Sequence, residues 1–310
     1  MNRSLIITDP LTLGADQLIA TNVPENDAPL WNATATYQLG DRVIFEHAVW
    51  ESAATTGTEG DLNIGKQPDI SGAVWWLRVG PTNRFAAFDT SRITATQQAG
   101  GFWHEFKPGY AINAIHVLHM HECNTLRITL TDPIAGVVFD TGVLAVGRVI
   151  TTASWWQWCF GRRVPITQKH FYDLPTYPNV VLRIEVTGGN NCAVGAILAG
   201  QITTFGLGVR TGLRLGIDDY SRKERDKWGA VTLAEGAYSD QIRLQLTLPN
   251  CELDALHDFM VQRRTKVLFW NASGRWNATG VYGFYKTWEI LISYAMYSDV
   301  SIELEGMDLK

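Results

Sequence analysis

The chain contains few charged residues and no run of basic ones. Lys, Arg, Asp and Glu make up 18% of its 310 residues, and the formal net charge is −5. A nucleic-acid-binding surface needs clustered Lys and Arg to neutralise phosphates, so this composition argues against nucleic acid as a partner. With 46% hydrophobic residues, the sequence predicts a compact protein whose surface is polar or covered by other subunits.

Cysteines and long apolar runs are also scarce. The four cysteines (Cys123, Cys159, Cys192 and Cys251) are widely separated and form no CxxC motif. This spacing predicts buried free thiols in a protein made in a reducing cytoplasm. No apolar run approaches the roughly 20 residues of a membrane helix, and the first seven residues lack the pattern of a signal peptide. We therefore expect cytoplasmic synthesis and no membrane span.

Motifs that carry catalysis are missing as well. The sequence contains no GxSxG, HExxH, Walker A or EF-hand pattern. Residues 218–227 mix both charge signs, but adjacent carboxylates in one loop do not provide the separate environments that acid/base chemistry needs. We interpret this run as a solvated or interface loop, and the sequence predicts a non-enzymatic protein without a cofactor.

Short alternating apolar stretches separated by turn residues dominate the chain, which is typical of strands. The one convincing helix follows Pro249, with Asn250 as its N-cap and Leu253, Leu256, Phe259 and Met260 at helical spacing. Residues 55–72 have the composition of a long loop. Strands are expected at residues 42–50, 74–79, 112–120, 125–130, 137–139, 155–160, 180–186, 193–204, 207–217, 230–248, 267–270, 281–292 and 300–304.

These patterns divide the chain into four parts of a mainly β protein. Residues 1–30 form an N-terminal arm that orders itself against something else, such as a neighbouring subunit. Residues 31–80 form a small Trp- and Gly-rich module, and residues 81–205 form a β-sandwich of jelly-roll type. Residues 206–310 form a β-rich α+β domain with one helix.

Tryptophan is abundant, at twelve residues. An excess of Trp favours sugar-stacking surfaces or protein–protein interfaces, and packing in ordinary β cores is the alternative. In a strand at residues 155–160, Trp156, Trp158 and Phe160 would face one way and Trp155 the other. One set belongs to the core, and for the other we favour an interface.

His119, His121 and Cys123 form a candidate metal site. In a strand these three side chains share one face, with neighbours roughly 6.6 Å apart, and such a set suits zinc or iron. His116 points to the opposite face, and no fourth ligand is evident. We therefore favour a polar stripe on a sheet, partly buried at a subunit contact, and predict no metal.

The aromatic residues of the small module follow a recognisable order. Trp31, Tyr37, Gly40-Asp41-x-Val43, Trp50 and Trp75–Trp76 resemble the small chitin-binding modules attached to bacterial chitinases. The resemblance implies sugar stacking on exposed aromatics, and the candidate site is Trp31, Tyr37, Trp50, Trp75 and Trp76. Trp50 stands where that family has Tyr, and residues 55–72 are longer than its loop. A purely structural use of the module, for docking within a particle, is the favoured alternative.

A second resemblance covers both ends of the chain. Residues 20–31 (ATNVPENDAPLW), 75–89 (WWLRVGPTNRFAAFD), 217–240 and 281–306 resemble parts of tail and baseplate proteins of tailed bacteriophages. This likeness implies a virion component, a distal tail protein that forms a threefold or sixfold ring or trimer around the end of the tail tube. Its expected partners are other tail proteins, further copies of itself and host surface glycan.

Two other functions are weighed against this one. A glycan-binding adhesin, the receptor-recognition protein of the tail tip, would show sugar affinity that depends on Trp50 or Trp75. An accessory fragment of a glycan hydrolase is disfavoured because no acid/base carboxylate pair is placed. For the structural protein, the interface candidates are Arg84, Phe85, Phe88, Trp155, Arg222 and Arg225, and Asp89 is expected to pair with Arg84 or Arg92.

Overall fold

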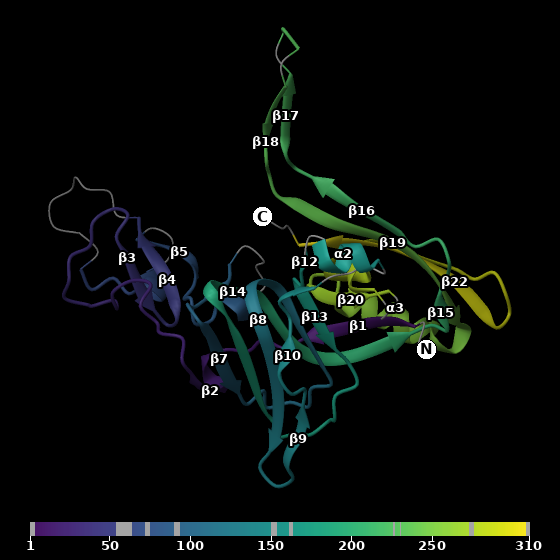
Figure 1. The fold of residues 1–310 in the computed structure, drawn as a ribbon, viewed down its shortest axis with the longest axis horizontal. Helices are drawn as coiled ribbons and strands as arrows, with labels where there is room; N and C mark the ends of the chain where they lie inside the picture. Colours follow the sequence, from purple (N-terminus) through teal and green to yellow (C-terminus); the bar gives the residue numbers. More distant parts are fainter. Residues whose placement is uncertain are drawn as a thin grey trace.

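A computed structural model describes residues 4–53, 64–71, 75–89, 94–149, 154–160, 164–225, 227–229, 231–272 and 276–307. The protein is mainly β, with 54% of residues in strands and 11% in helices, so the predicted fold class is confirmed. Figure 1 shows a small module at one side, a central body of long strands, and a narrow hairpin that projects from the body. Among the described residues, every helix is too short or too polar to cross a membrane.

Most strands belong to one sheet of 15 strands, and the rest form smaller sheets of two or three. The strands are β1 Leu5–Pro10, β2 Leu18–Thr21, β3 Arg42–Phe45, β4 Ala48–Ser52, β5 Trp76–Pro81, β6 Thr96–Gln97, β7 Gly101–Phe106, β8 Ala114–Asp132, β9 Gly136–Asp140, β10 Leu144–Ala145, β11 Arg148–Val149, β12 Val164–Pro165, β13 Gln168–Phe171, β14 Val181–Phe205, β15 Gly208–Val209, β16 Arg214–Asp219, β17 Arg222–Arg225, β18 Val231–Ala234, β19 Tyr238–Pro249, β20 Leu268–Asn271, β21 Gly280–Leu291 and β22 Tyr297–Gly306. The helices are α1 Pro68–Ser71, α2 Trp155–Phe160 and α3 Leu253–Gln262, with 3₁₀ turns at Ala15–Gln17, Ala86–Phe88, Asn250–Glu252 and Asn277–Thr279.

Two long antiparallel strands, β8 and β14, organise the large sheet. Each replaces two predicted strands, because the chain continues through the expected breaks. Their register shifts between Thr187 and Gly188 and again between Gly188 and Ala193. Before this bulge β14 pairs with β7, directly after it β14 pairs with β6, and from Gly200 onward β14 pairs with β1. The bulge is the place where strand pairing passes from one part of the protein to the next.

The expected N-terminal arm orders against the body of its own chain through β1 and β2. Strand β1 lies inside the large sheet, hydrogen-bonded to β14 on one side and to β20 on the other. Leu5 and Ile7 are completely buried, and they pack in one cluster with apolar side chains of β19, β20, β21, β22 and α3. Strand β2 likewise pairs with β7. Chain ends often order against another element of the same domain, and here the first strand joins the two large parts of the molecule.

Buried apolar side chains form two main clusters, one in each of the two large parts that β1 joins. The first is built chiefly by β7, β8 and β14. The second is built by β1, β19, β20, β21, β22 and α3, and Phe205 at the end of β14 belongs to it. Residues on both sides of the expected boundary at 205/206 therefore contribute to the second core, and one continuous sheet carries both cores.

Helix α3 confirms the predicted helix, and Leu256, Phe259 and Met260 face the second cluster. The expected N-cap is wrong. Asn250 donates through its side-chain amide to the carbonyl oxygens of Tyr294 and Ala295, and its Oδ1 accepts from the Ser298 hydroxyl at 2.6 Å. Asn250 therefore holds the loop between β21 and β22 instead of capping the helix.

The small module contains a three-stranded sheet, β3–β4–β5. Residues 42–50, predicted as one strand, form a hairpin that turns at Glu46 and His47, whose φ angles are 48° and 60°. Positive φ at both turn positions suits a two-residue hairpin whose twist matches its strands. The hairpin pairs Val43 directly with Trp50, so the two side chains lie on the same face of the sheet.

Three further expectations are corrected. Residues 155–160 form helix α2, not a strand. Residues 218–227, predicted as a loop, contribute to strands β16 and β17 at the base and side of the projecting hairpin. The described part of the predicted loop 55–72 includes the short helix α1.

Candidate functional site

Two of the five predicted sugar-stacking residues form the core of the small module. Trp76 is 1% exposed and Tyr37 is 8% exposed, and their rings meet edge to face at 5.1 Å between centroids. Trp76 Nε1 donates to the Lys66 carbonyl oxygen at 2.8 Å. A pyranose ring needs an open aromatic face, so the assignment of Tyr37 and Trp76 to a sugar site is wrong.

The other three aromatics lie at the rim of that core. Trp31, Trp50 and Trp75 are partly buried and pack against it. Trp50 Nε1 donates to the Phe45 carbonyl oxygen at 3.2 Å, and Lys66 Nζ lies 5.4 Å from the centre of the Trp75 ring. These contacts hold the indoles in fixed orientations while part of each remains in solvent, which a stacking platform requires.

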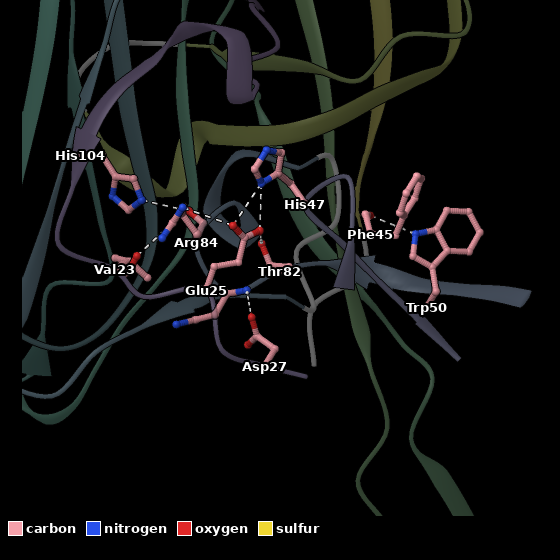
Figure 2. A network of polar contacts seen from close by, with 10 residues as sticks. Val23, Glu25, Asp27, Phe45, His47, Trp50, Thr82, Arg84 and His104 are labelled. Carbon is pink, nitrogen blue, oxygen red and sulfur yellow. Dashed lines mark hydrogen bonds and ion pairs between the residues drawn. The ribbon is translucent and has the colours of Figure 1, made fainter. Parts of the chain in front are cut away.

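A partly buried carboxylate, that of Glu25, connects the module to the central body (Figure 2). Glu25 Oε1 accepts from the Thr82 hydroxyl at 2.8 Å and lies 3.0 Å from His47 Nδ1, and Arg84 Nη1 lies 3.2 Å from Oε2. The Glu25 side chain is 13% exposed. Three donors from two segments converge on this one group, so it acts as a fixed acceptor at the junction.

Arg84 extends this network into the body. Its Nε donates to the Val23 carbonyl oxygen at 3.0 Å, and its own carbonyl oxygen accepts from His104 Nε2 at 2.9 Å. His104 is completely buried on β7, and burial lowers its pKa to about 4. The expected pairing of Arg84 with Asp89 is wrong, because Arg84 pairs with Glu25 and Asp89 accepts from the Thr94 hydroxyl. Arg92 lies outside the described residues.

The two junction phenylalanines pack within the chain. The Phe85 ring lies 4.9 Å from the His47 ring, and the Phe88 ring lies 4.5 Å from that of Phe106. Arg84, Phe85 and Phe88 were expected at an interface, and the structure places them at an internal one, between the module and the body. No sequence pattern indicated Glu25 as the centre of this junction.

The predicted histidine and cysteine stripe does not form a metal site. No three His, Cys, Asp or Glu side chains in the described part of the chain come together as metal ligands. His121 is exposed and Cys123 is buried, and positive φ angles of 54° at His119 and 51° at Glu122 break the alternation that would align them. His119 and His121 therefore do not share one face with Cys123.

His116 instead belongs to a buried aromatic cluster at the seam formed by β1. Its ring stacks on Phe269 at 4.0 Å, and its Nε2 lies 2.9 Å from the Thr8 hydroxyl of β1. The His170 ring is 5.3 Å away. Burial lowers the pKa of both imidazoles, that of His170 to about 4, so this seam holds neutral histidines near neutral pH.

Helix α2 presents an exposed aromatic surface. Trp155, Trp156, Trp158 and Phe160 are all between 62% and 75% exposed. Soluble monomers rarely expose a contiguous set of large apolar side chains, and such patches mark interaction sites. A strand would have placed either Trp155 or the set Trp156, Trp158 and Phe160 in a core, whereas the helix exposes all four side chains to solvent.

The hairpin β17–β18 is a second exposed surface, and Figure 1 shows it extending away from the body. Its two strands form a separate sheet whose residues are all exposed, including Leu233 at 71%. Trp228, between the two strands, is 83% exposed. At its base, a Cβ added to Gly236 would meet the Tyr220 carbonyl oxygen at 2.6 Å, so the two chain segments cross closely there. Residues 220–236, which include this hairpin, are called the arm below and are distinct from the expected N-terminal arm at residues 1–30.

Charged residues of the arm pair with one another. Arg222 forms an ion pair with Glu224, and Lys223 pairs with Asp219 and holds the pKa of that carboxyl well below its usual range. The register places Lys223 opposite Leu233 and Arg225 opposite Val231. One face of the arm therefore combines basic and apolar side chains, which suits a protein partner better than solvent.

A groove of about 710 Å³ lies on the sheet formed by β16, β19, β22 and β21. Its lining includes Arg243 and Glu303, which pair at 2.9 Å, and Trp288. The charges of this ion pair compensate each other, and Leu244, Trp288 and Ile302 add apolar lining, so the groove offers no convergent set of like charges.

The chain matches no protein-family model and no curated protein. Its fold and exposed surfaces therefore provide the basis for the functional proposal, together with the motif resemblances described above.

Proposed function

We propose that this chain is a structural, non-enzymatic component of a bacteriophage tail tip or baseplate, and that it assembles with copies of itself as a ring or trimer. The phage assignment depends on the motif resemblances at residues 20–31, 75–89, 217–240 and 281–306. The observation that carries the assembly function is the exposed arm. The arm needs a surface to pack against, because it exposes large apolar side chains to water.

An isolated two-stranded hairpin is at best marginally stable in water. The arm has no covering layer among the described residues, and it exposes Trp228, Val231 and Leu233. Nearby on β16, Leu215 is 52% exposed although it lies opposite the fully buried Ile242, so the apolar face of the sheet continues beyond its own core. A neighbouring copy that covers both surfaces removes this apolar area from water.

The oligomeric mass tests this proposal. Light scattering across a concentration series should give a threefold or sixfold multiple of the 34.5 kDa chain mass. A Trp228→Ser, Leu233→Ser double variant should dissociate at concentrations where the parent is assembled, because each substitution removes apolar area from the interface. An oligomer of unchanged mass and affinity would remove the arm from the assembly.

Ile134 provides a matched control. It is 97% exposed in the turn between β8 and β9, at the end of the body away from the arm in Figure 1. Ile134→Ser makes the same kind of change on an exposed site and should leave the oligomer intact. A parent that stays monomeric at all concentrations would contradict self-assembly itself.

The second candidate function is glycan binding by the small module, favoured by the fixed and partly open indoles of Trp31, Trp50 and Trp75. Titration calorimetry with chitin oligosaccharides tests it. Trp50→Ala and Trp75→Ala should each weaken binding about tenfold or more, while Trp228→Ala on the arm should not. If the parent protein shows no heat of binding, the module serves for docking within the particle.

A further inference from the structure

Two cysteines lie together at the bulge where β8 and β14 change partners. Cys123 Sγ is 3.6 Å from Cys192 Sγ, although 69 positions separate them in the sequence. Cys192 is completely buried and Cys123 is 6% exposed. Neither is in a disulfide in this structure.

The backbone makes room for this pair. A Cβ added to Gly188, opposite Cys123 in the register, would meet Cys192 Sγ at 2.6 Å and the Glu122 carbonyl oxygen at 2.3 Å. Only glycine lets the Cys192 side chain occupy this space. An S–S bond is about 2.05 Å long, so the sulfurs need to approach by roughly 1.5 Å, a movement within reach of side-chain rotation.

The two thiols are chemically unequal. Cys123 lies within hydrogen-bonding distance of Cys192 Sγ, which raises the pKa of Cys123 and lowers the pKa of Cys192. Cys123 also donates to the carbonyl oxygens of His121 and Ala193, both at 3.4 Å. Cys192 is therefore the more readily ionised thiol, and Cys123 is the neighbour positioned to react next.

We propose that Cys123 and Cys192 are a modification site, a thiol pair that a peroxide converts to a reversible intramolecular disulfide. The Cys192 thiolate attacks one peroxide oxygen and breaks the O–O bond, so that this oxygen becomes the hydroxyl of a sulfenic acid. The other oxygen leaves as hydroxide and becomes water by taking up the proton that the thiol released. The Cys123 thiol then attacks that sulfur, and a second water is released. The two thiols lose two electrons and two protons in total, and hydrogen peroxide is reduced to two waters.

The disulfide restrains the bulge of β14, which lies next to the junction between the small module and the body. The Cys192 carbonyl oxygen accepts from the Gln98 amide at 3.0 Å, and Asn83 of the junction exchanges two hydrogen bonds with Gln97, at 2.8 and 2.9 Å. A bond between Cys123 and Cys192 therefore restrains the segment that holds the module. This inference is independent of the proposed assembly function.

Intact mass spectrometry of the full chain tests the proposal. The exposed Cys159 and Cys251 are first replaced by Ser, so that the remaining thiols are those of the pair. Treatment with hydrogen peroxide, followed by alkylation in denaturant, should give a mass about 2 Da lower than the reduced chain, with no alkyl group attached. Proteolysis should give one linked peptide containing Cys123 and Cys192, and dithiothreitol should restore both thiols. The Tm should rise by roughly 4–8 °C on oxidation.

Cys192→Ser in the same background is the control. It should keep one alkylatable thiol after peroxide treatment and show no rise in Tm. The proposal is overturned if the parent remains doubly alkylated, if its sulfurs are oxidised to sulfinic acid without a linked peptide, or if the linked form is no more stable than the reduced form.

Discussion

Strand β1 and the arm are built from similar residues and have opposite surroundings. In β1, Leu5 and Ile7 are completely buried between β14 and β20. In β18 of the arm, Leu233 is 71% exposed in a sheet of only two strands. An apolar strand gains stability from what covers it, so β1 should stabilise the isolated chain, while the arm should contribute only when a partner is present.

The largest expected difference between β1 and the arm is in the free energy of unfolding of single variants. Ile7→Ala should lower the free energy of unfolding by about 2–5 kcal/mol, because it opens a cavity in the second apolar cluster. Leu233→Ala should change it by less than about 0.5 kcal/mol in the monomer, since the side chain already lies in solvent. Urea unfolding followed by tryptophan fluorescence measures both.

The contrast between β1 and the arm is wrong if Ile7→Ala and Leu233→Ala change the free energy of unfolding equally. A large loss for Leu233→Ala at low protein concentration would show that the arm packs against its own chain in solution. A small loss for Ile7→Ala would show that β1 docks weakly on its own chain, and would favour the expected arm that orders against a neighbouring subunit.

A decrease in pH should change the free energy of unfolding by an intermediate amount. The aromatic cluster beside β1 contains buried, neutral histidines, whereas the arm contains none. The pKa of His170 is lowered to about 4 by burial and by the nearby charge of Lys169, and the pKa of His116 is lowered by burial and by His170. Tyr172, whose pKa burial raises to about 12, stays neutral beside them. The unfolded chain binds protons below about pH 6.5 that the folded chain does not.

Stability should therefore be constant above about pH 6.5 and should fall as the pH decreases toward 4, by on the order of 3 kcal/mol. His170→Phe should flatten this decrease, because Phe keeps an aromatic ring against Phe269 and cannot be protonated. Unfolding curves at pH 7, 5.5 and 4.5 provide the measurement. An unchanged slope in the variant would assign the pH dependence to other groups, of which buried His104 is the first candidate.

The smallest expected effect concerns the junction, whose contacts are polar and partly buried. Glu25→Gln should destabilise the contact between module and body by about 1–2 kcal/mol, because the amide cannot accept from Thr82, Arg84 and His47 as the carboxylate does. Hydrogen exchange at residues 75–89 should increase, while exchange in β1 should not.

Glu51→Gln is the matched control for this change. Glu51 pairs with Arg42, which is 59% exposed, and both lie within the module. A surface pair of this kind contributes about 0–1 kcal/mol, so exchange at the junction should remain as in the parent. Equal effects of the two substitutions would show that Glu25 has no special role in docking the module.

Several elements could be predicted from local pattern alone. The helix after Pro249 follows from its apolar spacing, and Leu256, Phe259 and Met260 are buried as expected. The strands of the body follow from alternation and turn residues, although β8 and β14 continue through the expected breaks. Helix α2 was missed because a run of aromatics alternates between faces in a strand and also fits a short helix, so periodicity cannot distinguish the two.

The candidate sites depended more strongly on tertiary contacts. The positive φ angles at Glu46 and His47 form the hairpin that places Val43 with Trp50, and packing then buries Tyr37 and Trp76 while it leaves Trp50 and Trp75 at the rim. An aromatic residue has the same chemistry in a core and on a sugar-binding surface. Its neighbours in space determine which of these it serves.

By itself the sequence determined the mainly-β class, the position of helix α3 and the scarcity of charge, because strand alternation, helical spacing and composition are local properties. The tertiary structure alone decided that β1 completes the central sheet, that Glu25 joins the module to the body, and that Cys123 meets Cys192. These contacts join residues far apart in the chain. Their energies depend on burial and on the geometry of distant partners, which no local pattern encodes.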